Sequence, residues 1–259
     1  MRFACVVEYD GAGFSGWQRQ EHARSVQGAV EQALSFVADH PVRVSCAGRT
    51  DAGVHATWQV IHFDTGARRS ERSWLLGANA NLPGAVRLLQ VMPVDDGFHA
   101  RFSAQARSYR YVILNRSVPS GLLRHRVAWE HRPLDTAGMQ QGARQLIGEH
   151  DFSSFRAMAC QAKSPVRTIY RLQLARCGDL IYLDIEANAF LHHMVRNIAG
   201  VLMSVGCGDR PVEWVDEVLQ HRDRARGGVT APAGGLYLVG VSSPPGYPLA
   251  AGGVVPVYG

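Results

Sequence analysis

The chain has 259 residues, of which 46% are hydrophobic, so it can bury one large core or two small ones that are closely joined. Its formal net charge is +5 and its pI is about 9.1, which favours a polyanionic partner. The apolar runs are too short for a membrane helix or a secretory signal, so we expect a cytoplasmic protein with no membrane association.

The cysteines, histidines and basic residues narrow the chemistry further. The chain has five cysteines, an odd number that includes no C-x-x-C pair, so we expect reduced thiols. His192 and His193 are adjacent, and adjacent helical positions point about 100° apart, so we expect no metal site. Lys163 is the only lysine, and all other Lys/Arg positions are arginine. Arginine suits phosphate and stacks on bases, although biased codon usage also explains this preference.

The first half of the chain predicts the order strand, helix, strand, strand, helix, strand. Ser25 is a predicted N-cap, because the apolar residues that follow it recur on one helical face, and His40 and Pro41 end that helix. The segment 48–55 is a polar loop between two strands. The predicted elements are the strand 3–9, the helix from 26 to about 37, the strands 42–46 and 60–63, the helix 72–79 and the strand 86–92.

The second half predicts a similar order with little sequence similarity to the first. Asp135 is a predicted N-cap, and the apolar stripe from Leu191 to Val205 marks the clearest helix of the chain. The remaining predicted elements are strands near 109–113, 168–175, 180–187 and 236–241, the helix from 136 to about 147 and a short helix at 211–219.

This pattern predicts an α+β fold with two halves. Each half covers one face of its sheet with helices, and a cleft is expected between the two halves. We expect an N-terminal half at residues 1–104, a C-terminal half at 105–243 and a loose tail rich in Gly and Pro at 244–259.

The most informative loop is Cys46–His55, which places an Arg, a Thr and an Asp between two glycines. Such a loop can hold the carboxylate of Asp51 in a tight turn with Arg49 two residues away. An ordinary Asp-Gly surface turn is the alternative explanation.

Four further segments follow the same order as a known family. They are Tyr9–Gln20, Phe98–Ser103 with Tyr109–Tyr111, Asn188–Asn197 and Gly235–Leu238. Together with the Asp51 loop, they resemble the bacterial tRNA pseudouridine synthases that modify positions 38 to 40 of the anticodon arm. The resemblance covers about residues 1–243. It implies the pseudouridine synthase fold, with two ferredoxin-like βαββαβ halves whose sheets are mainly antiparallel and whose helices lie on the outer faces.

The resemblance also implies roles for individual residues. Asp51 stands at the position of the catalytic aspartate, and Tyr109 at that of the tyrosine that stacks on the target base. Arg49 resembles the arginine that replaces the extruded nucleotide, Arg196 the arginine that pairs with the aspartate, and Arg69 an arginine that helps to hold the flipped state. Segments expected to touch tRNA comprise Phe98, His99, Ala100, Arg101, Phe102, Ala159, Cys160, Gln161, Ala162 and Lys163. Such enzymes are homodimers that bind the anticodon stem-loop of tRNA and use no cofactor.

The reaction breaks the bond between uracil N1 and ribose C1′ and rejoins the base through C5, so it needs no redox cofactor. It does need a carboxylate that attacks C1′, adds to the base, or promotes elimination through a glycal, and the three routes stay open. Because burial raises the pKa of a carboxylate, a paired guanidinium such as Arg196 would keep it ionised. An aromatic ring such as Tyr109 offsets part of the cost of turning the base out of its stack.

For several residues, an ordinary surface position is an alternative to a functional role. Arg196 lies opposite the apolar stripe with His193 and Gly200, where small neighbours allow another segment to approach closely; Asn197 and the histidines favour a lined cleft, and a solvated helix face is the alternative. Further arginines are candidate phosphate contacts or surface charges, namely Arg68, Arg69, Arg101, Arg107 and Arg110.

Two other functions remain open from the sequence. One is a tRNA-binding or RNA-chaperone protein that has lost activity, although Asp51, Tyr109 and Arg196 are all present. The other is a glycosidase that acts on nucleosides or sugars, which usually needs two acidic residues, whereas these motifs offer one.

Overall fold

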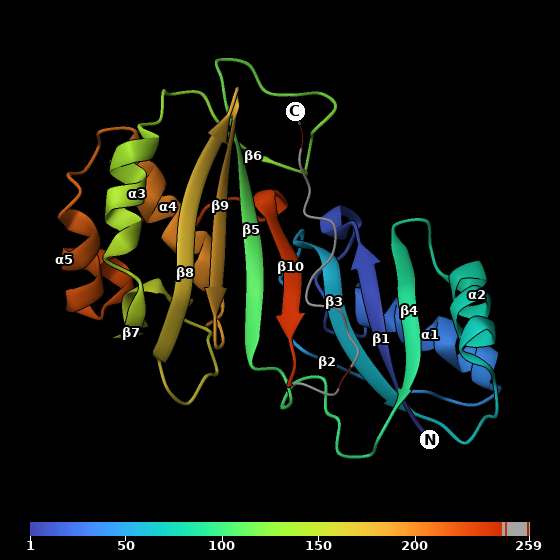
Figure 1. The fold of residues 1–259 in the computed structure, drawn as a ribbon. Coiled ribbons are helices and arrows are strands. Elements are labelled where there is room, and N and C mark those ends of the chain that lie inside the picture. The colour runs from blue at the N-terminus through green and yellow to red at the C-terminus, as the bar shows by residue number, and fades with distance from the viewer. Residues whose placement is uncertain (245–246, 248–257, 259) are drawn as a thin grey trace. The chain divides into compact units, whose positions relative to one another are not determined.

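The computed structural model describes residues 1–244, 247 and 258. The chain divides into two compact units (Figure 1). Unit 1 contains Met1–Gln105 and the segment that begins at Tyr237, and unit 2 contains Ala106–Leu236. Among the described residues, no helix combines the length and the apolar character that crossing a membrane requires.

The sheet of unit 1 is mainly antiparallel. Its strands are β1 (Arg2–Tyr9), β2 (Val44–Cys46), β3 (His55–Asp64), β4 (Val86–Val94) and β10 (Leu236–Ser242). Strand β1 lies between β4 and β3, antiparallel to both. Strand β2 pairs with the end of β3, and β10 pairs in parallel with its beginning. The loop that contains Asp51 therefore leads directly into a strand that is paired along its length.

Two helices, α1 (Val26–Ala38) and α2 (Glu71–Asn81), pack against each other in unit 1. Helix α1 begins where the hydroxyl of Ser25 accepts a hydrogen bond from the amide of Gly28, and it ends at Asp39, which adopts a left-handed conformation. Val30 and Leu34 on its apolar face are fully buried. Burial of one helical stripe against the rest of the unit explains why the periodic segment folds as a helix.

Within unit 2 the strands have the order β7, β8, β9, β5, and all three of these pairings are antiparallel. A short strand pairs with β5 in parallel. The strands are β5 (Ala106–Asn115), β6 (Ala128–Glu130), β7 (Gly148–Asp151), β8 (Val166–Cys177) and β9 (Leu180–Ala187).

The helices of unit 2 are α3 (Thr136–Arg144), α4 (Met194–Gly206) and α5 (Trp214–His221). Helix α3 packs on α4, α5 and β8, and α4 also contacts β5. Helix α4 is buried almost all round, because Asn197, Ala199 and Gly200 are buried as well as its apolar stripe. Arg196, Met203 and Ser204 are half-buried, so the helix presents little surface to solvent.

The predicted α+β class with mainly antiparallel sheets is confirmed, as are the N-caps Ser25 and Asp135 and the strand Leu180–Ala187. Helix α3 is shorter than predicted, since it ends at Arg144. The short strands β6 and β7 had no signal in the sequence analysis. The domain boundaries at residues 104 and 243 stay predictions. Most of the tail at 244–259 lies outside the described residues.

Candidate functional site

Asp51 lies half-buried in a tight turn between β2 and β3. The amide of Val54 donates to the carbonyl oxygen of Asp51 (3.2 Å), and Gly53 has a positive φ of 77°. A turn with φ > 0 at its third position strongly favours glycine there. The Asp-Ala-Gly sequence therefore forms the turn that the loop prediction required, with the carboxylate at its first position.

A second segment of unit 1 holds this turn from outside. The amide of Trp17 donates to the carbonyl oxygen of Thr50 (3.0 Å), and the hydroxyls of Tyr9 and Thr50 are 2.8 Å apart. A Cβ atom on Gly11 would lie 1.9 Å from the carbonyl oxygen of Val54, so only glycine fits at that approach. The segment Tyr9–Gln20, which belongs to the family resemblance, thus forms the wall against which the Asp51 loop is packed.

The end of the loop is fixed by His55, which is buried at the start of β3. Its Nδ1 accepts a hydrogen bond from the amide of Gly11 (3.0 Å), and its ring stacks on Tyr237 at 4.7 Å between centroids. Asp10 lies 3.1 Å from the same Nδ1. The amide of Gly11, the carboxylate of Asp10 and the ring of Tyr237 therefore all contact this imidazole and fix the end of the loop.

Arginines gather near the start of the loop. Arg49 is exposed, and both Arg49 and Arg101 lower the pKa of Cys46 electrostatically. Burial has the larger effect and raises the pKa of the Cys46 thiol to about 11. The two guanidinium groups therefore share one electrostatic environment within unit 1, which is favourable for a polyanion.

The segment Phe98–Phe102 has two kinds of side chain. Phe98 and Ala100 are buried in unit 1, whereas Phe102 is 76% exposed and contacts the tilted ring of His99 at 4.3 Å between centroids. The guanidinium of Arg101 lies 5.8 Å from the Phe102 ring. An RNA contact by this segment would involve its exposed members, and Phe98 and Ala100 have a packing role.

His62 on β3 positions that segment, a residue that the sequence analysis did not identify. Its Nδ1 accepts a hydrogen bond from the amide of Ala100 (3.1 Å), and the side chain is buried. Desolvation, assisted by His99, lowers the pKa of His62 to about 4. The imidazole is therefore neutral and acts as an acceptor. The one available signal was the place of His62 on the strand that follows the Asp51 loop.

Tyr109 of unit 2 lies on β5 and is buried, with an edge-to-face contact to Phe190 at 5.0 Å. Two residues earlier, Arg107 donates from Nη1 to the carbonyl oxygen of Asn188 (2.9 Å). The segment that carries Phe190 is thus attached to the strand that carries Tyr109. Both belong to motifs of the family resemblance that are distant in sequence.

Arg196 lies on α4 and is half-buried. Its Nε donates to the carbonyl oxygen of Ala231 (2.8 Å), and its own carbonyl accepts from the amide of Ala231. The expected close approach at Gly200 is confirmed, since a Cβ there would lie 1.8 Å from the carbonyl oxygen of Val229. The segment 229–231 therefore covers this face of α4, and a solvated face is excluded.

Asn197 does not line a cleft, contrary to our expectation. Its side-chain amide donates to the carbonyl oxygen of Phe155 (2.6 Å), and its Oδ1 accepts from Thr230 (2.6 Å) and Arg224 (3.2 Å). The side chain is 1% exposed. Asn197 is therefore the centre of a buried polar network that joins three segments of unit 2.

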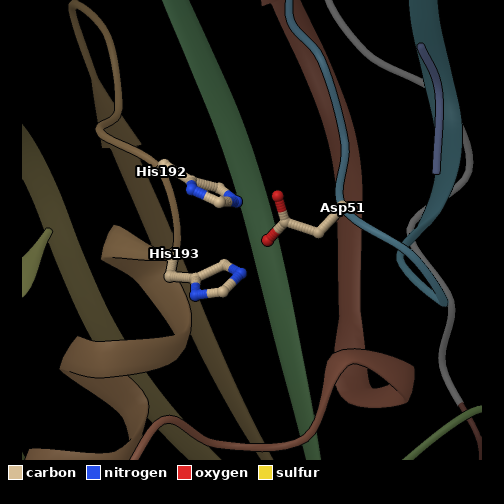
Figure 2. A group of neighbouring side chains, drawn as sticks. All are labelled: Asp51, His192 and His193. Atoms are coloured by element: carbon tan, nitrogen blue, oxygen red, sulfur yellow. The ribbon is translucent and has the colours of Figure 1, made fainter. Parts of the chain in front are cut away.

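The histidine pair also differs from the prediction. His192 and His193 precede α4, and His193 has a positive φ of 63°, so the helical angle of about 100° does not apply. Their ring centroids are 4.0 Å apart. Figure 2 shows both rings in the segment that leads into α4, and Asp51 in its loop, which belongs to unit 1.

The remaining predicted contacts fall into two groups. Arg68 and Arg69 are exposed just before α2. By contrast, Arg110 is held by Asp184 through two hydrogen bonds of 2.7 Å and lies over the ring of Tyr182. Arg110 is therefore a poor phosphate contact, because its charge is already matched.

In the segment 159–163, Ala159, Gln161 and Lys163 are exposed, and the amide of the neighbouring Ala157 donates to the carbonyl oxygen of His192 (2.9 Å).

Comparison with known proteins identifies the family of the chain. The family model described as tRNA pseudouridine synthase matches residues 5–103 and 143–243. The chain belongs to the tRNA pseudouridine synthase family. Proteins named "tRNA pseudouridine synthase A" are 60% identical in Methylococcus capsulatus (96% of this chain, 92% of the relative), 59% in Nitrosococcus oceani (94% of both) and 52% in Coxiella burnetii (96% and 95%).

Family membership defines the class of reaction. Pseudouridine synthases are isomerases, and this synthase therefore converts uridine of tRNA into pseudouridine. The matched residues include the Asp51 loop, the segment Phe98–Ser103 and the segment of Arg196. Tyr109 lies between the two matched ranges, so its assignment depends on the motif resemblance.

Proposed function

We propose that this synthase modifies uridines at positions 38, 39 and 40 in the anticodon stem-loop of tRNA, with Asp51 as its catalytic carboxylate. The observation that supports Asp51 most directly is its place in a turn that is fixed on both sides. The turn has a positive-φ glycine at its third position, and Gly11 allows the wall segment to approach the backbone of Val54. A carboxylate held in this way needs little reorganisation before it reacts.

Asp51 attacks C1′ or the base, or promotes elimination at the sugar, while the bond from N1 to C1′ breaks. The base then turns, C5 joins C1′, and the proton lost from C5 is balanced by a proton gained at N1. No atom is added or removed, and no cofactor takes part. Arg196 pairs with Asp51 in this proposal, which opposes the rise in pKa that a site without water would cause.

The target uridine must leave the base stack before Asp51 can reach it, at a cost of a few kcal/mol. Tyr109 stacks on the extruded base, a contact worth roughly 1 to 3 kcal/mol. Arg49 occupies the space left in the RNA, and Arg69 helps to hold the flipped state. The segments 98–102 and 159–163 contact the RNA, mainly through exposed side chains such as Arg101, Phe102 and Lys163.

The synthase acts as a homodimer in the cytoplasm, where each tRNA touches both subunits. A net charge of +5 supports binding of this polyanion.

Mapping of the product tests the proposal directly. The purified chain is incubated with unmodified tRNA, and pseudouridine is located along the RNA. Product at positions 38 to 40 is expected. Modification confined to another arm of the tRNA would refute the assigned positions, and release of free base would favour a glycosidase.

Asp51→Ala tests the catalytic role. We expect product formation to fall by at least about 10³-fold, because the reacting carboxylate is removed, while affinity for tRNA stays within a few-fold. Asp96→Ala is the matched control, since it removes an exposed carboxylate from the same unit and should retain full activity. Turnover of Asp51→Ala at the wild-type rate would show that another group carries the reaction.

A further inference from the structure

Arg167 is a cation whose charge is not matched by any acidic side chain among the described residues. It is the second residue of β8 and is half-buried opposite His150 of β7. Its Nη1 donates to the carbonyl oxygens of Ser164 (3.0 Å) and Val166 (2.5 Å). Its Nε is buried and has no hydrogen-bond partner in the described part of the chain. The guanidinium therefore has both neutral contacts and unused donors.

No described acidic side chain forms an ion pair with Arg167, in contrast to Arg110, which has Asp184. Burial lowers the pKa of the Arg167 guanidinium, and the charge-related interaction that opposes this comes from the Cys160 thiol. A desolvated charge without a counter-ion destabilises the fold unless something outside the protein compensates for it. This combination is typical of a group that receives an anionic ligand.

The position of Arg167 connects it to the candidate site residues of unit 2. Its neighbour Thr168 donates from the amide to Oδ1 of Asn188 (3.1 Å), and the amide of Asn188 donates back to the Thr168 carbonyl (3.1 Å). Asn188 is the residue whose carbonyl holds Arg107, and two residues later Phe190 packs on Tyr109. Arg167 is thus anchored to the same segment as the proposed stacking tyrosine.

We propose that Arg167 binds a phosphate of the tRNA backbone close to the target nucleotide. The phosphate oxygen meets Nη2 first, and Nε gains a partner when the side chain turns towards the RNA. A guanidinium suits this task because it stays charged and presents parallel donors to phosphate. This inference rests on the proposed function, since the ligand is the tRNA that the synthase modifies.

Arg167→Gln tests the contact, with Arg171→Gln as the matched control. Arg171 is exposed on the same strand and lies opposite Glu186, so both variants remove one positive charge from β8. Binding of full-length tRNA is measured over a series of salt concentrations. Removing one phosphate contact should reduce the slope of log affinity against log salt by about 0.7 to 0.9. We expect Arg167→Gln to bind about five- to tenfold more weakly at low salt by the loss of this contact. Arg171→Gln should retain the wild-type slope.

Stability provides a readout that a purely structural role would move in the other direction. Because an unmatched charge is removed, the melting temperature of Arg167→Gln should equal or exceed that of the wild type without RNA. A lowered melting temperature together with a wild-type salt slope would overturn the proposal and leave Arg167 as a packing residue.

A second variant covers the case in which Arg167→Gln does not fold. Arg167→Lys keeps the charge but loses the fork, so it should keep the wild-type slope and bind about two- to threefold more weakly. If Arg167→Lys binds tRNA with wild-type affinity, the guanidinium does not contact the phosphate through parallel donors, and the proposal is overturned. If the wild type modifies tRNA and both Arg167 variants have the wild-type affinity for tRNA and the wild-type salt slope, the inference about Arg167 fails and the proposed function stands. If the wild type forms no pseudouridine, the proposed function fails and this inference fails with it.

Discussion

The two units hold their candidate site segments in different ways. In unit 1, the Asp51 loop and the segment 98–102 are held by close backbone approaches and by single bonds from Tyr9 and His62. In unit 2, the segments around Arg196 are joined by the buried network of Asn197. Backbone approaches are limited by steric fit, whereas a polar network depends on every partner being present. Substitutions in the two units should therefore fail for different physical reasons.

Gly11→Ala should have the largest effect. Its new Cβ would lie 1.9 Å from the carbonyl oxygen of Val54, so a backbone segment must move. We expect a loss of at least about 3 kcal/mol in the free energy of unfolding, measured by denaturant titration. Gly13→Ala is the control, because nothing lies within 4 Å of a Cβ there. Similar midpoints for the two variants would show that steric fit does not hold the loop.

Asn197→Ala tests the polar network of unit 2. The substitution leaves the carbonyl of Phe155 and the side chains of Thr230 and Arg224 without a shared partner. We expect a loss of about 2 to 3 kcal/mol in the free energy of unfolding. Thr230→Ala combined with it in a double-mutant cycle should show strong non-additivity. Purely additive losses would contradict the network.

His62 makes the stability of unit 1 depend on pH. Its pKa is lowered to about 4 in the folded protein from an ordinary value of 6.5, so the unfolded chain binds more protons between these values. Stability from this group is complete above pH 6.5 and decreases as the pH falls towards 4, by about 2 kcal/mol between pH 6.5 and 5. His62→Gln keeps an acceptor for the amide of Ala100 but does not titrate. Denaturant titrations at pH 7 and pH 5 should show a smaller difference for this variant, and an equal difference would assign the effect to other groups.

Local signals explain which parts of the fold were predictable. Ser25 and Asp135 were identified as N-caps because a cap interacts within three residues of itself. The strand Leu180–Ala187 has the bounds expected from its apolar pattern. The strands β6 and β7 have only three and four residues, too few for a periodic pattern. Their formation depends on pairing with β5 and β8.

The errors at α4 have a common cause in long-range packing. Helical periodicity placed Asn197 on a polar face, but the segments of Phe155 and Thr230 cover that face. No pattern within α4 itself can report a covering segment that is about 30 or more residues away along the chain. The sequence motifs did identify Asp51 and Arg196 as candidates. The hydrogen bonds of His62 and Arg167 join residues outside these local patterns, so only the structure shows them.

Cys46 has a practical consequence for work on this enzyme. Its thiol stands five residues before the proposed catalytic acid, yet with a pKa of about 11 only about one molecule in 10⁴ carries the thiolate at neutral pH. Peroxide and alkylating reagents react through the thiolate, so they should spare the loop and attack the exposed Cys177 first. A fluorophore can accordingly be attached at this end of β8 to follow RNA association while the Cys46 thiol stays unmodified.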